Sequence, residues 1–368
     1  MKIRGLRHVR SRVAGIIVID SNPVHSPPIM KSLAALLSAL AFTLALQAQQ
    51  WVTYTPPEGK ANGKSVVLIS GDEEYRSEEG LPQLAKILSQ RHGFKCTVVF
   101  SINPKTGEID PNTQTNEPGI EALDSADLCI MLLRFRAWPD DQMKHFADYY
   151  LAGKPFIALR TSTHAFSYPD ASTSVYKAYS WNGKTWPQGF GKQVLGETWV
   201  SHWGNHKHEA TLGVVEPGSE KDKLLRGVTG LFGDTDVYEA HPPADAKILF
   251  RGRVLKGMSR TDEPADYKKK TATGVEQGVN EPMQPVVWTR EYKNEAGHTN
   301  KVFTTTMGSA TDLQDENLRR LLVNTAFRFT GQKVPKAADV ALVGEFHPTA
   351  YGFNGFVKGV KPADHVLK

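Results

Sequence analysis

The amino-acid sequence predicts an α/β fold, a parallel sheet with helices on both faces that carries an irregular, aromatic-rich insertion. The first observation behind this prediction is that short, continuous apolar runs alternate with stretches of helical periodicity. That alternation is typical of the βα units of a parallel sheet. The second observation is that the alternation stops near residue 165 and resumes near residue 282, which indicates the insertion.

Four buried strands are expected in the first half of the fold, because each segment is a continuous apolar run of strand length. They span residues 65–70, 95–100, 126–133 and 155–160. Helices should lie between them. One has leucines at helical spacing over 81–88 and ends at Gly93, and the other begins at Pro139 and ends at Gly153. A proline in the first turn and a glycine after the last turn are usual helix boundaries.

The pattern returns in the last third of the chain. Two strands, 285–289 and 301–306, are expected to form a hairpin, and a helix with an apolar stripe over 318–327 should end near Gly331. The sequence therefore indicates one domain over residues 64–331. The tail over 332–368 is rich in Gly, Pro and aromatic residues and is expected to pack along the surface in extended form.

The insertion is expected at about residues 165–282, over the carboxyl edge of the sheet. It holds four of the seven tryptophans and two strand-like pieces, 209–215 and 246–251. The run Lys268–Lys270 is expected to be a solvated loop.

The N-terminal segment has the features of a secretory signal peptide at residues 30–48. Met30 is followed by one lysine, an apolar run over 33–46 and a small residue, Ala48, which is the order of a signal peptide with its cleavage site. Residues 1–29 are interpreted as a mis-assigned extension before the true start. We therefore expect a periplasmic or secreted protein with no stable membrane span after cleavage; a retained N-terminal anchor is the alternative.

Charge and cysteine content exclude two classes of protein. The whole chain has a net charge of +5, and residues 1–48 carry six Lys or Arg and one Asp. The remainder is therefore close to neutral and lacks the basic footprint of a nucleic-acid-binding protein. Its cysteines, Cys96 and Cys129, are too few for a disulfide framework. Both lie in apolar runs and are expected to be buried thiols.

Polar side chains follow three of the predicted strands. The carboxyl ends of such strands meet at one edge of an open α/β sheet, where ligands bind. Carboxylates beside arginines can set opposed acid and base pKa values, although they can also form a purely structural ion-pair network. The candidates after strands one, three and four are Asp72, Glu73, Glu74, Tyr75, Arg76, Arg134, Arg136, Arg160, Thr161 and His164.

A second candidate segment lies in the insertion, where His202, His206 and His208 surround Trp203. The histidine spacing resembles that of metal ligands, and imidazole suits zinc, copper, iron or nickel. Tryptophan beside histidine and asparagine is also the composition of a sugar-binding surface. An aromatic mini-core that stabilises the insertion is the structural alternative.

These segments together resemble the ThuA-like (trehalose-utilisation) family of the class I glutamine-amidotransferase-like superfamily. The resemblance covers residues 64–331. It is carried by the motifs at 70–79, 154–166, 202–208, 285–290 and 301–324. It implies a flavodoxin-like sheet and a link to sugar metabolism, with keto-glycosides as the substrates.

The resemblance does not extend to amidotransferase chemistry. The superfamily carries a cysteine nucleophile after strand four, where this chain has Arg160-Thr161-Ser162. Many ThuA-like chains carry Gly-His after the last strand, where this chain has Gly308-Ser309. Neither half of a Cys-His pair is present, so thiol catalysis is set aside.

Three hypotheses follow for the function. In the first, the protein is a secreted enzyme, a glycoside hydrolase or lyase, that acts on a sugar or keto-glycoside by acid/base chemistry without a cofactor. The second is a non-catalytic carbohydrate-binding module, and the third is a hydrolase with a divalent metal on the insertion histidines. In the first, Glu74, His164 and His206 transfer protons. The residues expected to bind the substrate are Asp72, Tyr75, Arg76, Arg134, Arg136, Arg160, Thr161 and Trp203.

Overall fold

The computed structural model describes residues 49–367. The predicted signal peptide at 30–48 and the extension at 1–29 lie outside the described residues. Within the part of the chain that is described, no helix is both long and apolar enough to cross a membrane.

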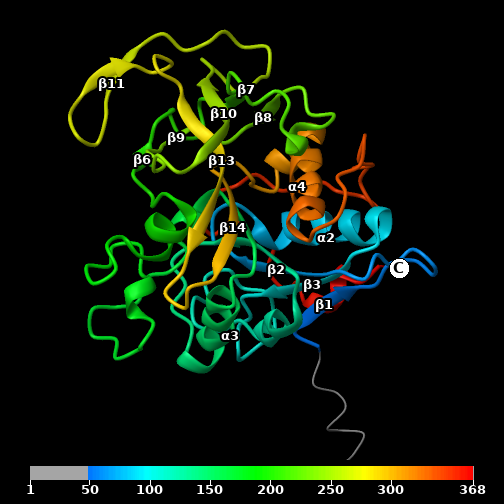
Figure 1. Ribbon diagram of the computed structural model, residues 1–368. Coiled ribbons are helices and arrows are strands. Elements are labelled where there is room, and N and C mark those ends of the chain that lie inside the picture. Colours follow the sequence, from blue (N-terminus) through cyan, green and yellow to red (C-terminus); the bar gives the residue numbers. More distant parts are fainter. Residues whose placement is uncertain (1–48, 368) are drawn as a thin grey trace, which may run out of the picture. The chain divides into compact units, whose positions relative to one another are not determined.

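A ten-stranded mixed sheet forms the centre of the molecule (Figure 1). Five of its strands are mutually parallel and lie side by side in the order β3, β2, β4, β5, β14. In chain order this is 2-1-3-4-5, the flavodoxin-like arrangement. The predicted α/β fold is therefore confirmed. The five strands are β2 (Ser65–Gly71), β3 (Lys95–Phe100), β4 (Leu128–Leu133), β5 (Phe156–Leu159) and β14 (Thr299–Thr305).

Helices cover both faces of this parallel part, because its strands are apolar on both sides. Helices α2 (Ser77–His92) and α4 (Glu316–Phe329) share one apolar core, which takes every second residue of β2, such as Leu68. Helix α3 (Asp140–Leu151) packs in a second core, which takes the alternate residues, such as Ile69. The alternation follows from the opposite directions of successive side chains in a strand.

The predicted insertion contributes strands to the main sheet. Beyond β14 the sheet continues with antiparallel strands, in the order β13, β10, β7, β8. The strand-like pieces expected at 209–215 and 246–251 are β7 and β10. These four strands are β7 (Thr211–Val215), β8 (Leu231–Gly233), β10 (Lys247–Val254) and β13 (Gln284–Lys293).

Two small sheets lie outside the main one. Strand β6 (Ser201–His202) pairs with β9 (Tyr238–Glu239), and β11 (Lys268–Lys270) pairs with β12 (Glu276–Gly278). The prediction of a loop at Lys268–Lys270 is therefore wrong, although Lys268 and Lys270 are exposed to solvent as expected. The middle lysine is held in place, since the ammonium of Lys269 donates to the backbone carbonyls of His202 and Trp203 at 2.8 and 2.9 Å.

Both ends of the described chain pack against the parallel sheet. Residues 51–54 form an edge strand, β1 (Trp51–Tyr54), antiparallel to β3. The described part of the tail, residues 332–367, has no strand, and the hydroxyl of Tyr54 donates to the carbonyl of His365 at 2.7 Å. The short helical turns are η1 (Ile120–Ser125), η2 (Arg160–His164), η3 (Lys177–Tyr179), η4 (Gly191–Leu195, a π-turn), η5 (Lys223–Leu225), η6 (Asp312–Gln314) and η7 (Pro362–His365).

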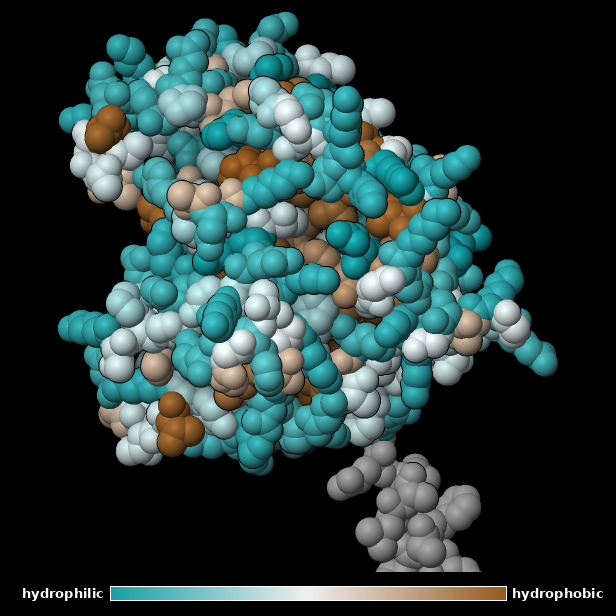
Figure 2. All heavy atoms as spheres, viewed as in Figure 1, coloured by the Kyte–Doolittle hydropathy of each residue, from teal (hydrophilic) through white to brown (hydrophobic). Residues whose placement is uncertain are grey.

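The surface in the same view is mostly hydrophilic (Figure 2). The apolar side chains that it exposes gather mainly at the level of β13 and α4. Both cysteines are buried free thiols, as predicted.

Candidate functional site

The ends of β2, β4 and β5 meet at the carboxyl edge of the sheet. Buried Asp72, after β2, accepts a hydrogen bond from the hydroxyl of Thr161, after β5. Glu73 forms ion pairs with Arg134 and Arg136, which follow β4; the Arg136 Nη2–Glu73 Oε2 distance is 2.8 Å. The structure thus brings the three predicted strand ends together.

Each of these strand ends contains a residue with left-handed backbone geometry. The φ angles are +57° at Arg76, +53° at Phe135 and +43° at Arg160. Side chains other than glycine seldom adopt this region, and residues held there concentrate at functional sites. The edge of the sheet is therefore under local backbone strain at three places.

Arg160 is completely buried and anchors the next layer of the site. Its guanidinium donates to the carboxylate and the carbonyl of Asp236 at 2.8 and 2.6 Å and to the carbonyl of Thr306 at 2.7 Å. It also lies over the ring of Tyr238, 3.7 Å from the centroid. The guanidinium of Arg160 therefore bonds to groups of the protein itself, and its positive charge compensates the negative charge of Asp236.

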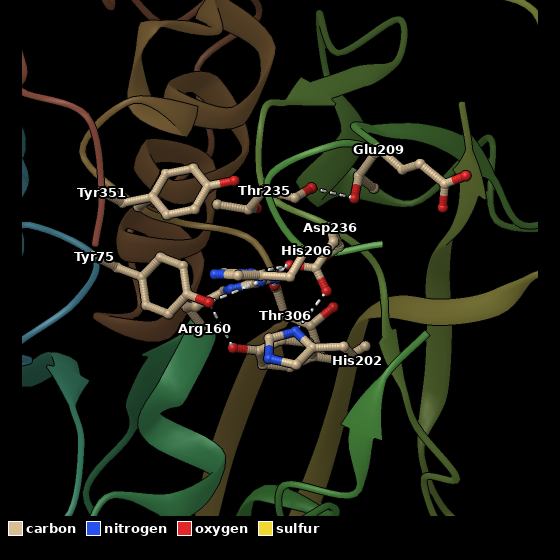
Figure 3. A network of polar contacts seen from close by, with 12 residues as sticks. Tyr75, Arg160, His202, His206, Glu209, Thr235, Asp236, Thr306 and Tyr351 are labelled. Carbon is tan, nitrogen blue, oxygen red and sulfur yellow. Dashed lines mark hydrogen bonds and ion pairs between the residues drawn. The ribbon is translucent and has the colours of Figure 1, made fainter. Parts of the chain in front are cut away.

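Two histidines converge on Asp236 (Figure 3). His202 Nδ1 lies 2.8 Å from Asp236 Oδ2, and His206 Nδ1 lies 2.9 Å from Asp236 Oδ1. Burial alone would raise the pKa of Asp236, but Arg160 and the hydrogen bonds of both histidines outweigh it and hold that pKa well below its ordinary value. Asp236 is therefore a buried, permanently ionised group beneath both imidazoles.

His206 lies between two carboxylates. Its Nε2 atom is 3.1 Å from Glu74 Oε1, on the side opposite Asp236. The hydrogen bonds to Asp236 and Glu74 raise the pKa of His206 to about 9, against a smaller opposing effect of burial. The imidazole is therefore protonated at neutral pH and is partly open to solvent, with 25% of its side chain exposed.

Three tyrosines enclose this cluster. The hydroxyl of Tyr75 accepts a hydrogen bond from the hydroxyl of Tyr238, at 3.1 Å, and another from the guanidinium of Arg160, at 3.2 Å. The ring of Tyr351, from the C-terminal tail, lies 5.3 Å from that of Tyr75 and 5.6 Å from that of His206. Figure 3 shows Tyr75 and Tyr351 on the same side of the histidines.

Two further carboxyl groups near the cluster have raised pKa values. Burial, together with the charge of Glu73, raises the pKa of Asp72 to about 6. Burial and the neighbouring Asp312 raise the pKa of Asp234 to about 7. Raised and depressed carboxyl pKa values within one cluster are typical of acid/base sites.

His164 belongs to a row of aromatic rings that leads to the cluster. Its ring lies 5.1 Å from Phe135 and 6.1 Å from Trp199, and Trp199 lies 5.9 Å from His202. Phe135 in turn contacts Trp181 at 5.7 Å. Burial, with Arg134 and Arg160 nearby, holds the pKa of His164 well below its ordinary value. His164 is therefore a neutral ring within an aromatic wall.

Several of the site residues predicted from the sequence are engaged in hydrogen bonds within the protein. Arg76 donates to the carbonyls of Glu74 and Gly352, and Arg136 donates to Glu73 and to backbone carbonyls. The indole of Trp203 is fully buried and donates to the carbonyl of Val279 at 2.7 Å. His208 is exposed and lies outside the cluster formed by His202 and His206.

The sequence reasoning missed Asp236, Tyr238 and Tyr351. Asp236 lies two residues before β9 and Tyr238 lies within it, both inside the predicted insertion, and Tyr351 lies in the tail. None belongs to a periodic pattern or a spaced motif. The alternation of acidic and neutral residues over 234–236 is the single local signal, and it is too short to distinguish a site from a loop.

His202, His206 and Asp236 could also hold a metal ion. One ligand atom of each lies within 4.8 Å of the others, and two histidines with one carboxylate form a recognised set for transition metals. The buried guanidinium of Arg160 opposes this, because it places a positive charge 2.8 Å from a carboxylate oxygen that would coordinate the ion.

Neither a family model nor a curated protein matches the sequence. Among solved structures, the chain is similar to a protein from Parabacteroides merdae described as ThuA-like, with 15% sequence identity and a TM-score of 0.47. That similarity covers 79% of this chain and 97% of the other. A second protein described as ThuA-like, from Bacteroides uniformis, has 17% identity and a TM-score of 0.42, over 77% of this chain and 95% of the other. The fold is assigned from the strand order of the parallel sheet.

Proposed function

We propose that the protein is a secreted, ThuA-like enzyme that acts on a sugar or keto-glycoside by acid/base chemistry. The observation that carries this proposal is the position of His206 between Glu74 and Asp236, with Arg160 buried beneath Asp236. The arrangement holds a protonated imidazole beside a carboxylate at the carboxyl edge of the sheet. A proton donor and a proton acceptor in contact are the minimum requirement for general acid/base catalysis.

The chemistry of a keto-glycoside suits this pair. A ketone makes the hydrogen on the adjacent carbon acidic, so Glu74 can remove that proton as the base. His206 then donates its Nε2 proton to the departing glycosidic oxygen as the C–O bond breaks, which forms a carbon–carbon double bond conjugated with the ketone and frees the aglycone as an alcohol. The proton taken up by Glu74 then returns to His206, whose Nε2 atom is 3.1 Å away. Asp236 and Arg160 keep the imidazole oriented, as a buried carboxylate does for a catalytic histidine.

The aromatic row supports a carbohydrate as the substrate. Phe135, Trp181 and Trp199 are partly exposed rings beside the cluster. Aromatic faces next to a few polar groups are the usual composition of a site that grips a sugar. The resemblance of the strand-end motifs to ThuA-like chains and the expected signal peptide point the same way.

The proposal is tested with nitrophenyl 3-keto-glucosides of both anomeric configurations, measured as release of nitrophenol. Glu74→Gln is expected to lower kcat/KM on these substrates at least about 100-fold, the range of general acid/base catalysis. His206→Gln should have the same effect on methyl 3-keto-glucoside, assayed by mass spectrometry, because an alkoxide needs a proton to leave whereas nitrophenolate does not. His208→Gln is the matched control, since that histidine is exposed and outside the cluster. Full activity of both site variants would contradict the proposal, and binding of the sugar without any product would favour the binding module.

A metal-dependent hydrolase is the second candidate, because His202, His206 and Asp236 have ligand atoms within 4.8 Å of one another. Metal analysis of untagged protein purified with zinc, iron and manganese present decides between them. One bound ion per chain that is lost in both His202→Ala and Asp236→Ala would favour the hydrolase. No bound ion, with turnover unaffected by a chelator, would exclude it.

A further inference from the structure

The C-terminal tail is fastened to the candidate site through residues 349–352. Arg76 donates to the hydroxyl of Thr349 at 3.1 Å and to the carbonyl of Gly352 at 2.8 Å. The backbone N–H of Gly352 donates to the carbonyl of Glu74 at 2.8 Å, and that of Thr349 donates to Glu79 at 2.7 Å. The tail is therefore bonded to the same turn that supplies Glu74.

Tyr351 places its ring directly against the proton donor of the site. Its ring lies 5.6 Å from that of His206, and its hydroxyl donates to the backbone carbonyl of Asp234 at 3.0 Å. Only 8% of Tyr351 is exposed. The ring therefore closes one side of the imidazole and limits how it can turn.

Phe353, two residues further on, has the opposite character. It is 52% exposed, so its ring offers an apolar face to solvent. Its ring centroid lies 4.9 Å from the guanidinium carbon of Arg134, which in turn lies 4.3 Å from the ring of Phe135. The guanidinium of Arg134 therefore contacts two aromatic rings, those of Phe135 and Phe353, and forms an ion pair with Glu73, the residue before Glu74.

The contact with Arg134 leaves much of the Phe353 ring open to solvent, so the ring gives up most of the stabilisation that burial would provide. An exposed aromatic face beside a partly exposed arginine, which is the case for Arg134 with 20% exposure, offers a sugar both a surface for its C–H groups and donors for its hydroxyls.

We propose that residues 349–355 form one wall of the active site, in which Phe353 binds the sugar ring of the substrate and Tyr351 positions His206. The proposal rests on the proposed function and adds the tail to the site. Substrate would then lie along the exposed side of Phe353 and Arg134, next to Glu74 and His206.

Phe353→Ala tests the binding role in the full-length protein. With nitrophenyl 3-keto-glucosides, KM is expected to rise about fivefold or more while kcat stays within twofold, because the variant loses a contact with the sugar ring that is equal in the ground state and the transition state. Phe353→Trp should keep the wild-type KM. Val357→Ala is the control, since Val357 is 53% exposed on the same tail. Unchanged KM in Phe353→Ala would overturn this part.

Tyr351→Leu tests the positioning role. The expected result is a fall in kcat of about tenfold with little change in KM, and Tyr351→Phe should restore most of it because the ring, and not the hydroxyl, faces His206. A purely structural role would lower the melting temperature of Tyr351→Leu while leaving kcat of the folded fraction unchanged. That outcome, or equal kcat values in Leu and Phe variants, would overturn the positioning role.

The two proposals fail in different ways. If the wild-type protein turns over no keto-glycoside, the proposed function fails, and binding of the 3-keto-glucoside by calorimetry then tests Phe353 alone. If the wild type is active and depends on His206, but both tail variants behave like the wild type, the tail is no part of the site.

Discussion

At the scale of single residues, the buried pair of Arg160 and Asp236 determines the electrostatics of the candidate site. Both side chains are fully excluded from solvent, and they lie 2.8 Å apart. A buried ion pair contributes little net stability, yet removing one partner leaves an uncompensated charge in a medium of low dielectric constant. A substitution at either residue therefore also raises the free-energy cost of burying the charge of its partner.

Arg160→Met is expected to lower the free energy of unfolding by about 3–5 kcal/mol, because Asp236 would lose its fully buried countercharge and keep only the two partly exposed imidazoles. Asp236→Asn alone should also be destabilising, while the double variant should be less so than the sum of the two. A double-mutant cycle from urea unfolding gives the coupling directly. Additive effects would show that the two groups are independent in solution.

His206 predicts a specific dependence of stability on pH. Its pKa is about 9 in the folded protein, above the ordinary value of about 6.5 for an unfolded chain. A group whose pKa is raised by folding contributes stability that is fully present below pH about 6.5 and is lost as the pH rises through about 9.

The corresponding measurement is chemical unfolding between pH 6 and 10 in the presence of a chelator. The wild type should lose at most about 3 kcal/mol from this group, and less because its side chain is 25% exposed and screened by solvent. His206→Gln should lack that part of the decline. Parallel curves for the two proteins over this range would show that the imidazole is not stabilised as a cation.

At the scale of elements, the turn η2 after β5 is supported by the π-turn η4, and one glycine allows the contact. A Cβ atom on Gly191 would lie 1.8 Å from the carbonyl oxygen of Thr163 and 3.0 Å from that of Glu197. Both are backbone atoms and cannot move aside. The placement of Thr161 and His164 therefore depends on the absence of a side chain in a different segment.

Gly191→Ala is expected to destabilise the protein by about 3 kcal/mol or more, at or above the usual range for overpacking. Gly230→Ala is the matched control, because its Cβ would meet only one carbonyl oxygen, at 3.5 Å. Thermal unfolding of the two variants makes the comparison. Equal melting temperatures would mean that η4 and η2 separate easily.

Elements of the parallel sheet could be predicted from the sequence because each buries a continuous apolar run. The predicted strand at 95–100 coincides with β3, and the helix that ends at Gly93 is α2. The meeting of Asp72, Glu73 and the arginines followed from the strand-end rule. Asp236 and Tyr351 could not be found, because pairing between distant segments, and not local periodicity, brings them to His206.

At the scale of the whole molecule, the net charge of +5 is carried by residues 1–48. If the proposed signal peptide is cleaved near Ala48, the mature protein should have an isoelectric point well below the value of 8.9 for the full chain. Expression in a Gram-negative host, followed by isoelectric focusing and N-terminal sequencing of the periplasmic fraction, checks both. A full-length cytoplasmic product would contradict the expectation.

The three left-handed residues at the strand ends have a consequence for how this protein would respond to selection. Glycine adopts such a backbone without strain, so Phe135→Gly would relax the main chain while removing a ring from the aromatic row. Screening for heat resistance should therefore favour Phe135→Gly only when turnover is not required, because Arg76 and Arg160 are held by hydrogen bonds that a glycine would lose. At Phe135, selection for stability and selection for activity would favour different residues.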